Sequence, residues 1–552
     1  MNSKTANLLL LLIISVLFLS CNSKKSEQEN RVVIGIIADV QTLNALFAFS
    51  YEEFIIAEEL YPGLIQTKWN KDKGEMEPFP LIAKSWVWSA DSSSIKFFMR
   101  DGIYWSDGQK LTAEDVVFSY DVFSDPDVQS RLYSTFNYFY TESNGHIDIK
   151  KTFKIISPYE LEVDLPKTSV PNLKEFDLTL VPKHIYEKID RTKLVNDESN
   201  FNPVTSGAYK LKEWERNQDI TLEADSNSFL FHNGQIAEIV FKVVPDYTSR
   251  ILQLQKGEID FMDAVKVEDV DELKQNDNLS IVSVFGRDYD YIGWNHIDSE
   301  AYSEGLSKPN KLFGSKKVRK ALSMAINRKE IFDEYLLGLG ELAASPVSSM
   351  FKSAFNEEVK PYEYNPAEAK KLLAEEGWKD EDNNGILKKG NVEFKFKMYY
   401  PAGNPLREYA SVVIKNNLKS VGVEMIPEKM ELGTFIDNLY KKKIDSWMAG
   451  WGVSMNLKLK RLWYSDPNVT SINFMSYRNQ EIDDILDELD TKVTSERKNE
   501  LIKKLQVILH EDEPVTFLYW TPNVVAYNKR IKNPDISPYS VIVNCRDWTL
   551  GE

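Results

Sequence analysis

The sequence predicts a mixed α/β protein with two lobes, and three patterns support this prediction. Residues 31–38 form a continuous β-branched run of the kind that a buried strand shows. Between residues 244 and 261 a Pro-Asp pair precedes a helical stretch, Gly257 stops it and a short apolar strand follows, which is typical of α/β lobes. After an aromatic-rich strand at 289–295, helical periodicity again alternates with strand patterns, which predicts a second α/β lobe.

The other elements are predicted from apolar spacing and from turn residues. Before residue 245 they are a helix at 53–64 closed by Pro62-Gly63, strands within 81–99 around a turn at 91–93, mixed elements within 113–195 that include a strand pair at 155–165, and strands within 207–224 and 236–244. In the second lobe they are helices 317–337 and 366–376, strands 392–400 and 421–429, helices 479–488 and 495–511, and strand 515–519. The tail from Val524 is expected to return to the first lobe.

Composition excludes some functions. The 552 residues are 43% hydrophobic and 12% aromatic, which is enough for large cores and excludes a disordered chain. Lys and Arg number 67 against 84 Asp and Glu, a net charge of −17. General nucleic-acid binding needs a basic face that releases phosphate counterions, so the acidic balance argues against it.

The N-terminus predicts a signal peptide over residues 1–20. Lys4 precedes an apolar core at 8–19 that is too short to span a bilayer. Ser20-Cys21 at its end resembles a lipoprotein processing site, in which Cys21 becomes the acylated N-terminus, although Phe18 stands where Leu is commoner. The alternative is an ordinary secretory signal that happens to contain a cysteine.

The segment after Cys21 is expected to be a lipidated tether. Residues 21–30 are polar and unpatterned beyond the cysteine, which suits a flexible connection between a membrane and a folded domain. Cys545 is the only other cysteine, so acylation of Cys21 would leave no intrachain disulfide.

Residues 100–120 carry the most informative local pattern. Gly108 supplies a tight turn, Thr112 is expected to be a helix N-cap, and Glu114 and Asp115 place negative charge in the first turn. As a string, this segment resembles the signature of the family 5 extracellular solute-binding proteins, the oligopeptide- and dipeptide-binding receptors of ABC importers. Further segments resemble the same family in the same order: 202–210, 318–328, 364–378, 450–452 and 510–515.

This resemblance implies a two-lobed periplasmic binding protein fold of type II, in its large form, with an extra α/β domain inserted in the first lobe. The expected division is lobe I at 31–60, 203–288 and 521–552, the inserted domain at 61–202, and lobe II at 289–520. The implied protein is a monomer on the extracytoplasmic side of a membrane. It captures a peptide or peptide-like solute between its lobes and delivers it to ABC transporter permease subunits, because a ligand that contacts both lobes stabilises the closed form.

Other functions stay open at this stage. One is a receptor of the same fold for an oligosaccharide, a metal chelate or an anionic solute, and another is a signalling or adhesion role without transport. A secreted hydrolase has weaker support, because the histidines are dispersed and carboxylate pairs are common in so acidic a chain. Residues 380–385 resemble half of an EF-hand loop, but its last position is Asn391 instead of a bidentate Glu, which favours a plain turn. No cofactor or metal is expected.

Aromatic residues at the ends of predicted lobe II strands are candidates for a ligand site. A receptor for an extended ligand needs flat apolar walls, and open α/β sheets bind ligands at strand ends. Ordinary core packing is the alternative for each of them. The candidates are Trp294, Tyr399, Trp447, Trp451, Trp463 and Tyr464.

The resemblance adds two more places. Peptide receptors of the family use a Gly-Trp-x-x-Asp segment, in which backbone groups pair with the ligand main chain and the Asp holds its α-ammonium. Here the segment begins at Gly450, Trp451 and Gly452, but Ser454 replaces the Asp, so free peptide N-termini are not expected to be strongly selected unless an acid on the facing lobe substitutes. On that facing lobe, the family's ligand contacts correspond to 49–51, which are Phe49, Ser50 and Tyr51.

A basic stretch follows at 456–461. Lys458, Lys460 and Arg461 would favour an anionic ligand if they face the cleft, and a solvated surface turn is the alternative.

Overall fold

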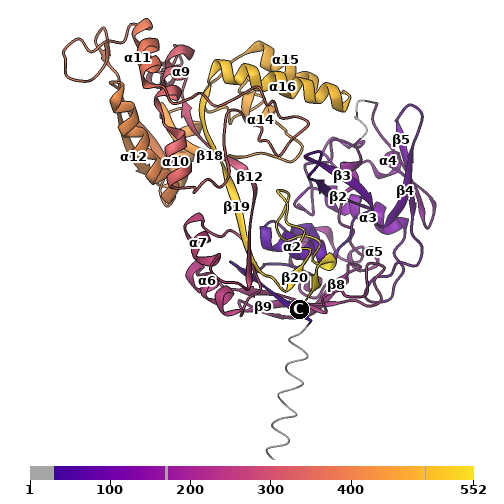
Figure 1. Ribbon diagram of the computed structural model, residues 1–552. Coiled ribbons are helices and arrows are strands. Elements are labelled where there is room, and N and C mark those ends of the chain that lie inside the picture. Colours follow the sequence, from indigo (N-terminus) through magenta and orange to yellow (C-terminus); the bar gives the residue numbers. More distant parts are fainter. Residues whose placement is uncertain (1–29, 168, 170–171, 492, 552) are drawn as a thin grey trace, which may run out of the picture.

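The computed structural model describes residues 30–551 apart from 168, 170, 171 and 492. It is a two-lobed α/β structure in which two long strands connect the lobes, with a further group of strands and helices beside the first lobe (Figure 1). Cys21 and the expected signal peptide lie outside the described residues. Over the part of the chain that the structure describes, no helix is long and apolar enough to cross a membrane.

One large sheet runs through both lobes, in the order β17-β16-β18-β12-β19-β11-β1-β10-β9-β8, and β13 also pairs with β19. We call the part built on β1 and β8 to β11 lobe I, and the part built on β16 to β18 lobe II. The lobe I strands are β1 (Arg31–Ile36), β8 (Tyr209–Glu215), β9 (Asp219–Ala224), β10 (Glu238–Val243) and β11 (Phe261–Met262). Those of lobe II are β13 (Glu341–Leu342), β16 (Lys395–Pro401), β17 (Glu424–Met430) and β18 (Ser446–Gly452).

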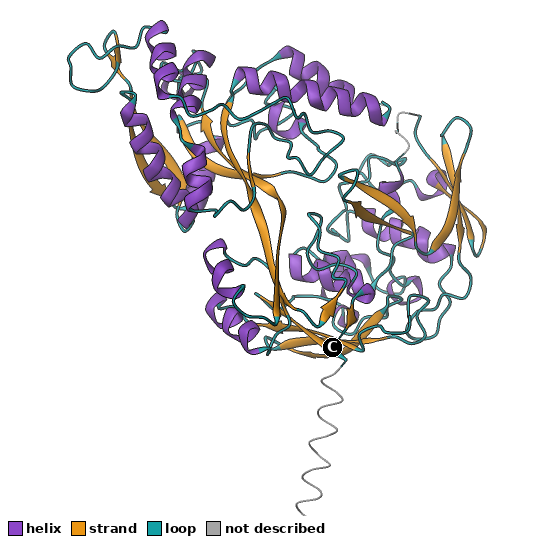
Figure 2. Ribbon diagram, in the orientation of Figure 1, coloured by secondary structure: helices purple, strands orange, loops and turns teal. Residues whose placement is uncertain are grey.

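The two connecting strands are β12 (Leu279–Trp294) and β19 (Val515–Asn528), which pair antiparallel along most of their length (Figure 2). Both are longer than the sequence predicted, because each continues from one lobe into the other. Their pairing register shifts between Phe285 and Tyr289, an irregularity of the kind that lets a sheet bend. At this point a Cβ atom on Gly286 would collide with the carbonyl of Thr521, so only glycine fits.

The helices of lobe I flank this sheet. Helix α2 (Tyr51–Leu60) begins at a capping box, because Ser50 accepts from the N–H of Glu53 and the Glu53 carboxylate accepts from the N–H of Ser50. Helix α6 (Tyr247–Lys256) ends at Gly257 in the left-handed conformation, as its sequence predicted. Helix α7 (Val270–Leu273) and the 3-10 turns η1 (Ala45–Phe47), η5 (Val267–Asp269) and η6 (Cys545–Asp547) complete it.

The group beside lobe I, which we call the side domain, contains a hairpin and a four-stranded sheet. The hairpin is β2 (Ile65–Asn70) with β3 (Glu75–Pro80), and the sheet has the order β4 (Ala83–Trp88), β5 (Ser94–Met99), β7 (Glu160–Asp164), β6 (Phe153–Ser157). Thr112 caps α3 (Ala113–Ser124) in a capping box with Asp115, which confirms the predicted N-cap. The other short elements are α4 (Ile149–Thr152), α5 (Lys183–Tyr186), η2 (Leu173–Phe176), η3 (Arg191–Asn196) and η4 (Glu198–Asn200).

Lobe II carries the longest helices together with several short ones. They are α8 (Ser299–Ser303), α9 (Lys316–Ala325), α10 (Arg328–Glu334), α11 (Pro366–Glu375), α12 (Pro405–Ser420), α13 (Leu432–Tyr440), α14 (Lys460–Trp463), α15 (Gln480–Leu489) and α16 (Ser495–Asp512). The single helix predicted at 317–337 is wrong. Ile326 leaves the helical conformation and Asn327 caps a new helix by accepting from the N–H of Glu330, so α9 and α10 are separate. A small hairpin joins β14 (Lys388–Lys389) to β15 (Val392–Glu393). Near the C-terminus, β20 (Ile531–Lys532) pairs antiparallel with β21 (Thr549–Leu550) across the longer segment 533–548.

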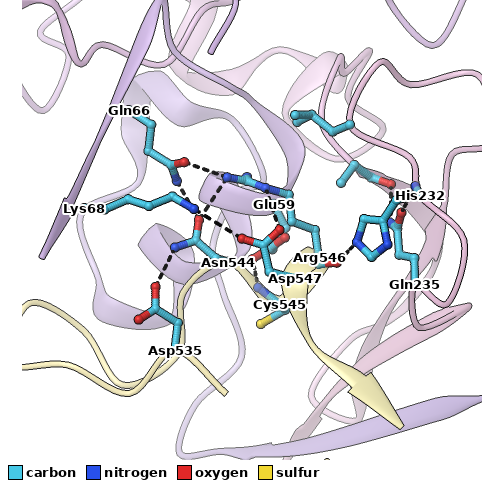
Figure 3. Close-up of polar contacts among 12 residues, drawn as sticks. Glu59, Gln66, Lys68, His232, Gln235, Asp535, Asn544, Cys545, Arg546 and Asp547 are labelled. Atoms are coloured by element: carbon cyan, nitrogen blue, oxygen red, sulfur yellow. Dashed lines mark hydrogen bonds and ion pairs between the residues drawn. The ribbon is translucent and has the colours of Figure 1, made fainter. Parts of the chain in front are cut away.

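The C-terminal segment ties lobe I to the side domain (Figure 3). The N–H of Cys545 donates to the Glu59 carboxylate of α2 at 2.7 Å, and Arg546 donates to Gln66 of β2 at 2.7 Å. Burial raises the pKa of Glu59. The segment at 545–546 therefore contacts both α2 of lobe I and the hairpin of the side domain, and it fixes where the side domain lies.

The side domain also contacts lobe II through the tip of its hairpin. The ring of Trp69 packs edge-on against Phe351 at 6.2 Å, and the Ser353 hydroxyl donates to the carbonyl of Lys73 at 3.2 Å. Gly74, with φ of 69°, lies so close to the carbonyl of Met350 that no Cβ would fit. Lobe II is thus in contact with the rest of the molecule at the connecting strands and at this hairpin tip.

Candidate binding site between the lobes

A cavity of about 590 Å³ lies where β12 and β19 pass from one lobe to the other. Its wall combines residues of lobe I, of the two connecting strands and of lobe II. They are Tyr51, Asp263 to Glu268 and Pro538 to Val541 from lobe I, Phe285 to Asp288 and Thr521 to Val524 from the strands, and Tyr335, Leu336 and Gly403 to Leu406 from lobe II. A ligand in this cavity would touch both lobes at the place where the molecule can bend.

A smaller cavity of about 360 Å³ continues this surface into lobe II. It shares four residues with the first and is lined in addition by Asp290, Arg407 and the segment 450–452 of β18. The shared residues are Asp288, Asn404, Leu406 and Thr521. We treat the two cavities together as the cleft.

Glycines of β18 make room for charged side chains in the cleft. A Cβ atom on Gly452 would come within 2.7 Å of the Asp288 carboxylate, and one on Gly450 would come within 2.7 Å of the Asp290 carboxylate. These residues are neighbours because β12 and β18 pair antiparallel, with Asp288 opposite Gly452 and Asp290 opposite Gly450. The two glycines therefore allow acidic side chains to lie over the backbone of β18.

The edge of β18 is open at this segment. Its antiparallel partner β12 covers one side, and on the other side the parallel neighbour β16 pairs with it at Tyr399 and Trp447. Within the described residues no strand pairs with 450–452 on that second side. The backbone there can pair with an added extended chain, which is how many peptides bind at exposed sheet edges.

Asp290 and Arg407 form a buried ion pair behind the cleft surface. The guanidinium donates to both carboxylate oxygens, at 3.0 Å from Nε and 2.7 Å from Nη2. Burial raises the pKa of Asp290 and the positive charge of Arg407 opposes that shift. Asn404 caps α12 by accepting from the N–H of Arg407 at 3.0 Å. The pair and the cap together fix the first turn of α12 against β12.

The lobe I wall presents Tyr51 and Asp263. Burial raises the pKa of Asp263 to about 6, a shift that Arg250 opposes and Glu52 reinforces. Burial, followed by the negative charge of Asp263, likewise raises the pKa of the Tyr51 hydroxyl, which lies 3.5 Å from the Ser540 hydroxyl. A carboxylate next to a phenol gives this wall the polar groups that a mostly apolar ligand site needs.

The structure brings four of the predicted site residues to the cleft and leaves others outside. Tyr51, Gly450, Trp451 and Gly452 line the two cavities. Ser50 caps α2 beside Tyr51, and Phe49 is 71% exposed, but neither lines these cavities. Tyr399 is half-buried on β16 and also lies outside their lining.

Trp294 is a core residue, which corrects the expectation that it contacts ligand. It is fully buried, packs against Phe313 at 4.8 Å between ring centres, and donates from its indole N–H to Thr516 at 3.0 Å. Trp447 and Trp463 are buried as well, and Tyr464 hydrogen-bonds Asp487 on the lobe II surface.

Ser454 and the basic stretch also lie outside the lining of the cleft. The Ser454 hydroxyl accepts from the N–H of Lys458 at 3.0 Å, which is a local turn. Lys460 pairs with Asp487 of α15 and with Asp490, the C-cap of that helix, at 2.7 Å each. For Lys460 the structure therefore favours the alternative that this stretch is a solvated surface turn.

Sequence reasoning missed Asp263, Arg287, Asp288, Asn404 and Arg407. Only Asn404 carried a usable local signal, since Asn before Pro405 is a helix-start pattern. The others come together through strand pairing between distant segments.

Comparison with known proteins identifies relatives over the whole chain. The sequence profile of the bacterial extracellular solute-binding proteins, family 5, matches residues 77–470. The oligopeptide-binding protein AppA of Bacillus subtilis is 28% identical over 576 residues, which cover 100% of this chain and 99% of AppA. The dipeptide-binding protein of Escherichia coli is 23% identical over 87% of each chain.

Solved structures agree with this match. The structure of AppA from Bacillus subtilis in complex with a nonapeptide has a TM-score of 0.68 at 28% identity, and covers 95% of this chain and 99% of that one. The ABC transporter substrate binding protein CtaP of Listeria monocytogenes has a TM-score of 0.76 at 22% identity, again over 95% of this chain and 99% of that one, which shows the same fold.

Proposed function

Because this chain belongs to family 5 of the bacterial extracellular solute-binding proteins, we propose that it captures a peptide in the cleft between its lobes and delivers it to the permease subunits of an ABC importer. The observation that supports a peptide ligand is the open edge of β18 at 450–452, which lines the cleft and offers unpaired backbone groups to an extended chain. Members of the family are extracytoplasmic, and so is this protein.

Native mass spectrometry of the purified mature protein tests the ligand class. We expect a co-purified set of masses that fragment as peptides. Recovery of only a saccharide or a metal chelate would contradict the proposal. We also propose binding without turnover, so a peptide incubated with the protein should be recovered intact by chromatography.

Tryptophan fluorescence tests the place of binding. Trp451 is half-buried at the cleft whereas Trp294 is fully buried in the lobe II core. Adding the co-purified peptide to stripped protein should change the fluorescence of the wild type and of Trp294→Phe. Trp451→Phe should lose most of this change. An unchanged response in Trp451→Phe would place the ligand elsewhere.

The charge of the ligand is a separate proposal. Ser454 stands where peptide receptors of the family place an acid, so we expect peptides with a free N-terminus to bind no more than tenfold, about 1.4 kcal/mol, better than their N-acetylated forms. Calorimetry on the wild type and on Ser454→Asp measures this, and Ser454→Asp should raise the preference. Asp263 and Glu268 of lobe I and Asp288 of β12 are carboxylates of the cleft that could replace the missing one, whereas Asp290 is paired with Arg407. A wild-type preference above tenfold that disappears in Asp263→Asn, Glu268→Gln or Asp288→Asn would show the prediction to be wrong and identify the replacement.

We further propose that Cys21 is acylated and anchors the protein, that residues 21–30 are a tether, and that the protein acts as a monomer. Cys21→Ala should release the protein from the membrane fraction. Equal partition of the variant and the wild type into that fraction would contradict the proposed anchor.

The lobe boundaries proposed from the sequence, between 288 and 289 and between 520 and 521, fall inside β12 and β19.

A further inference from the structure

A second large cavity lies in lobe II, away from the cleft. It has a volume of about 640 Å³ and is formed by the segment after β12, by the end of α13 and by residues 465–478. The pairing of β12 with β18 begins at the cleft, with Asp288 opposite Gly452, and ends with Trp294 opposite Ser446. Six residue steps along a strand separate these pairs, so the two cavities lie at opposite ends of a strand pair about 20 Å long. We call this one the distal cavity.

The distal cavity is basic in an acidic protein. Its lining includes Lys442 and Arg478 but no Asp or Glu, although the chain has a net charge of −17. Most of its other polar groups are hydroxyls. Those of Ser303, Thr470 and Ser476 already donate within the protein, to Glu300, Arg461 and Asn295. The other hydroxyl residues of the lining, which can donate hydrogen bonds to an anion, are Tyr302, Ser307, Tyr440, Ser465 and Ser471.

Lys442 is the partly buried charge of this wall, whereas Arg478 is exposed. Its ammonium donates to the carbonyls of Asn473 at 2.6 Å and Phe474 at 2.9 Å, and no described carboxylate lies within ion-pair distance of it. An ammonium has three N–H groups, so one remains for a further acceptor. Burial lowers the pKa of Lys442 to about 8, which is the effect expected of a partly buried cation without a counter-charge.

The backbone of this wall is left-handed at two places, at Lys442 with φ of 54° and at Ser476 with φ of 57°. Lys442 follows α13 in a common left-handed helix end, because its N–H donates to the carbonyl of Leu439 and the N–H of Lys443 donates to the carbonyl of Asn438. The Lys442 side chain reaches the carbonyls of residues 473 and 474 from this helix end.

We propose that the distal cavity is a second binding site, which takes a small doubly charged oxyanion between Lys442 and Arg478. Oxyanions of the sulfate and phosphate type match a wall of ammonium, guanidinium and hydroxyl donors, because charge-assisted hydrogen bonds are stronger than neutral ones. The site is independent of the cleft and of the peptide proposed to bind there.

Sulfate is the probe of choice, because its charge is constant across the pH range in which Lys442 titrates. Calorimetric titration of the full-length mature protein with sodium sulfate, against sodium chloride at equal ionic strength, should give saturable binding at one site. Lys442→Gln and Arg478→Gln should each weaken this binding at least tenfold. Arg478 is exposed, so its variant keeps the test valid if Lys442→Gln does not fold.

Matched controls separate the distal cavity from other basic surfaces. Lys443→Gln removes an exposed neighbouring charge that does not line the cavity, and Trp451→Phe alters the cleft. Both should bind sulfate like the wild type. Non-saturable heats, or equal affinity in the wild type, Lys442→Gln and Arg478→Gln, would overturn the proposal and show a general ionic effect only.

A pH series adds a readout that depends on the Lys442 charge. The other ionisable groups of the lining are Arg478, Tyr302 and Tyr440. His296 is also close to Lys442, and burial, Arg319 and Lys442 hold its pKa well below its usual value, so that it stays neutral. Sulfate affinity should fall about tenfold between pH 7 and pH 9 in the wild type, as a group with a pKa near 8 loses its proton. Lys442→Arg should show a flat profile. A flat profile in the wild type would contradict the assigned role of Lys442.

Discussion

At the scale of single residues, the cleft depends on charges that are expensive to keep buried. Asp290 and Arg407 have side chains that are 5% and 16% exposed, and their two hydrogen bonds hold the start of α12 against β12. Burying either group without the other would leave a charge with neither water nor a partner. The pair therefore fixes the geometry of the lobe II wall more than it stabilises the fold.

A double-mutant cycle tests this role. Arg407→Leu should lower the free energy of unfolding by about 3–5 kcal/mol, because it leaves Asp290 buried and unpaired. Adding Asp290→Asn to that variant should recover part of the loss, since the unpaired charge is then gone. Urea denaturation of the four proteins measures the coupling. Strictly additive effects of the two changes would show that the pair is not energetically coupled.

Asp263 makes a second residue-scale prediction, on pH dependence. Its folded pKa of about 6 is above its usual 3.8, because of burial, so the folded protein binds this proton more tightly than the unfolded chain. The group thus favours folding below pH 3.8, and that contribution is lost as the pH rises through 6. Asp263→Asn should therefore stabilise the protein at pH 7.5 by about 1–3 kcal/mol and by nearly nothing at pH 3.5. Denaturation curves at the two pH values check this. An Asn variant that is equally stable or less stable at pH 7.5 would contradict it.

At the scale of elements, the hairpin of β2 and β3 holds lobe II through its tip. Gly74 lies against the backbone of Met350 and Lys352, whereas Gly102 of the same domain also has a positive φ, of 75°, but has no neighbour within 4 Å of where its Cβ would be. The two glycines share the backbone requirement and differ in packing.

This difference yields a controlled test. Alanine at either position should lower the free energy of unfolding by about 1 kcal/mol, because its side chain disfavours the left-handed backbone conformation. Gly74→Ala must in addition displace the Met350 carbonyl, so we expect it to lower the free energy of unfolding by about 1–3 kcal/mol more than Gly102→Ala does. Thermal unfolding of the two variants decides the matter. Equal losses would mean that the hairpin tip and lobe II do not stay in contact in solution.

Local signals predicted many elements, and long-range pairing decided the rest. The Thr112 cap and the Gly257 stop could be predicted because caps and turns depend on neighbouring residues. The full lengths of β12 and β19 could not be predicted, because the residues that pair are far apart in the sequence. Leu279 pairs with Asn528, most of lobe II lies between them in the sequence, and no residue close to either one indicates the pairing.

The direction of the strands mattered as well, because the C-terminal ends of neighbouring strands lie at the same edge of a sheet only when the strands are parallel. Trp451 ends β18 at the cleft, and Trp294 ends the antiparallel β12 at the opposite side. The rule therefore agrees with the position of Trp451 at the cleft, where ligand contact stays a prediction, and it does not hold for the buried Trp294.

At the scale of the whole molecule, the cleft and the bending point coincide. Residues from lobe I, lobe II and both connecting strands line one cavity, and the register of those strands shifts beside it. A ligand that contacts both walls binds more tightly to the arrangement in which the walls are closest. Ligand binding therefore shifts the equilibrium between the open and closed forms towards the closed form. The hairpin tip limits how far lobe II can move while that contact holds.

The last prediction concerns closure. Small-angle scattering of the wild type should show a smaller radius of gyration when the co-purified peptide is added to stripped protein. Gly286→Ala places a Cβ against the Thr521 carbonyl and must push β12 and β19 apart at the bend, so it should reduce this compaction and weaken peptide binding at least tenfold. Ser283→Ala, an exposed change on the same strand, should behave like the wild type. Identical scattering profiles of the wild type with and without saturating peptide would rule out closure. Full compaction in Gly286→Ala would instead place the bend elsewhere, because the strands would then tolerate separation at the one point where glycine is required.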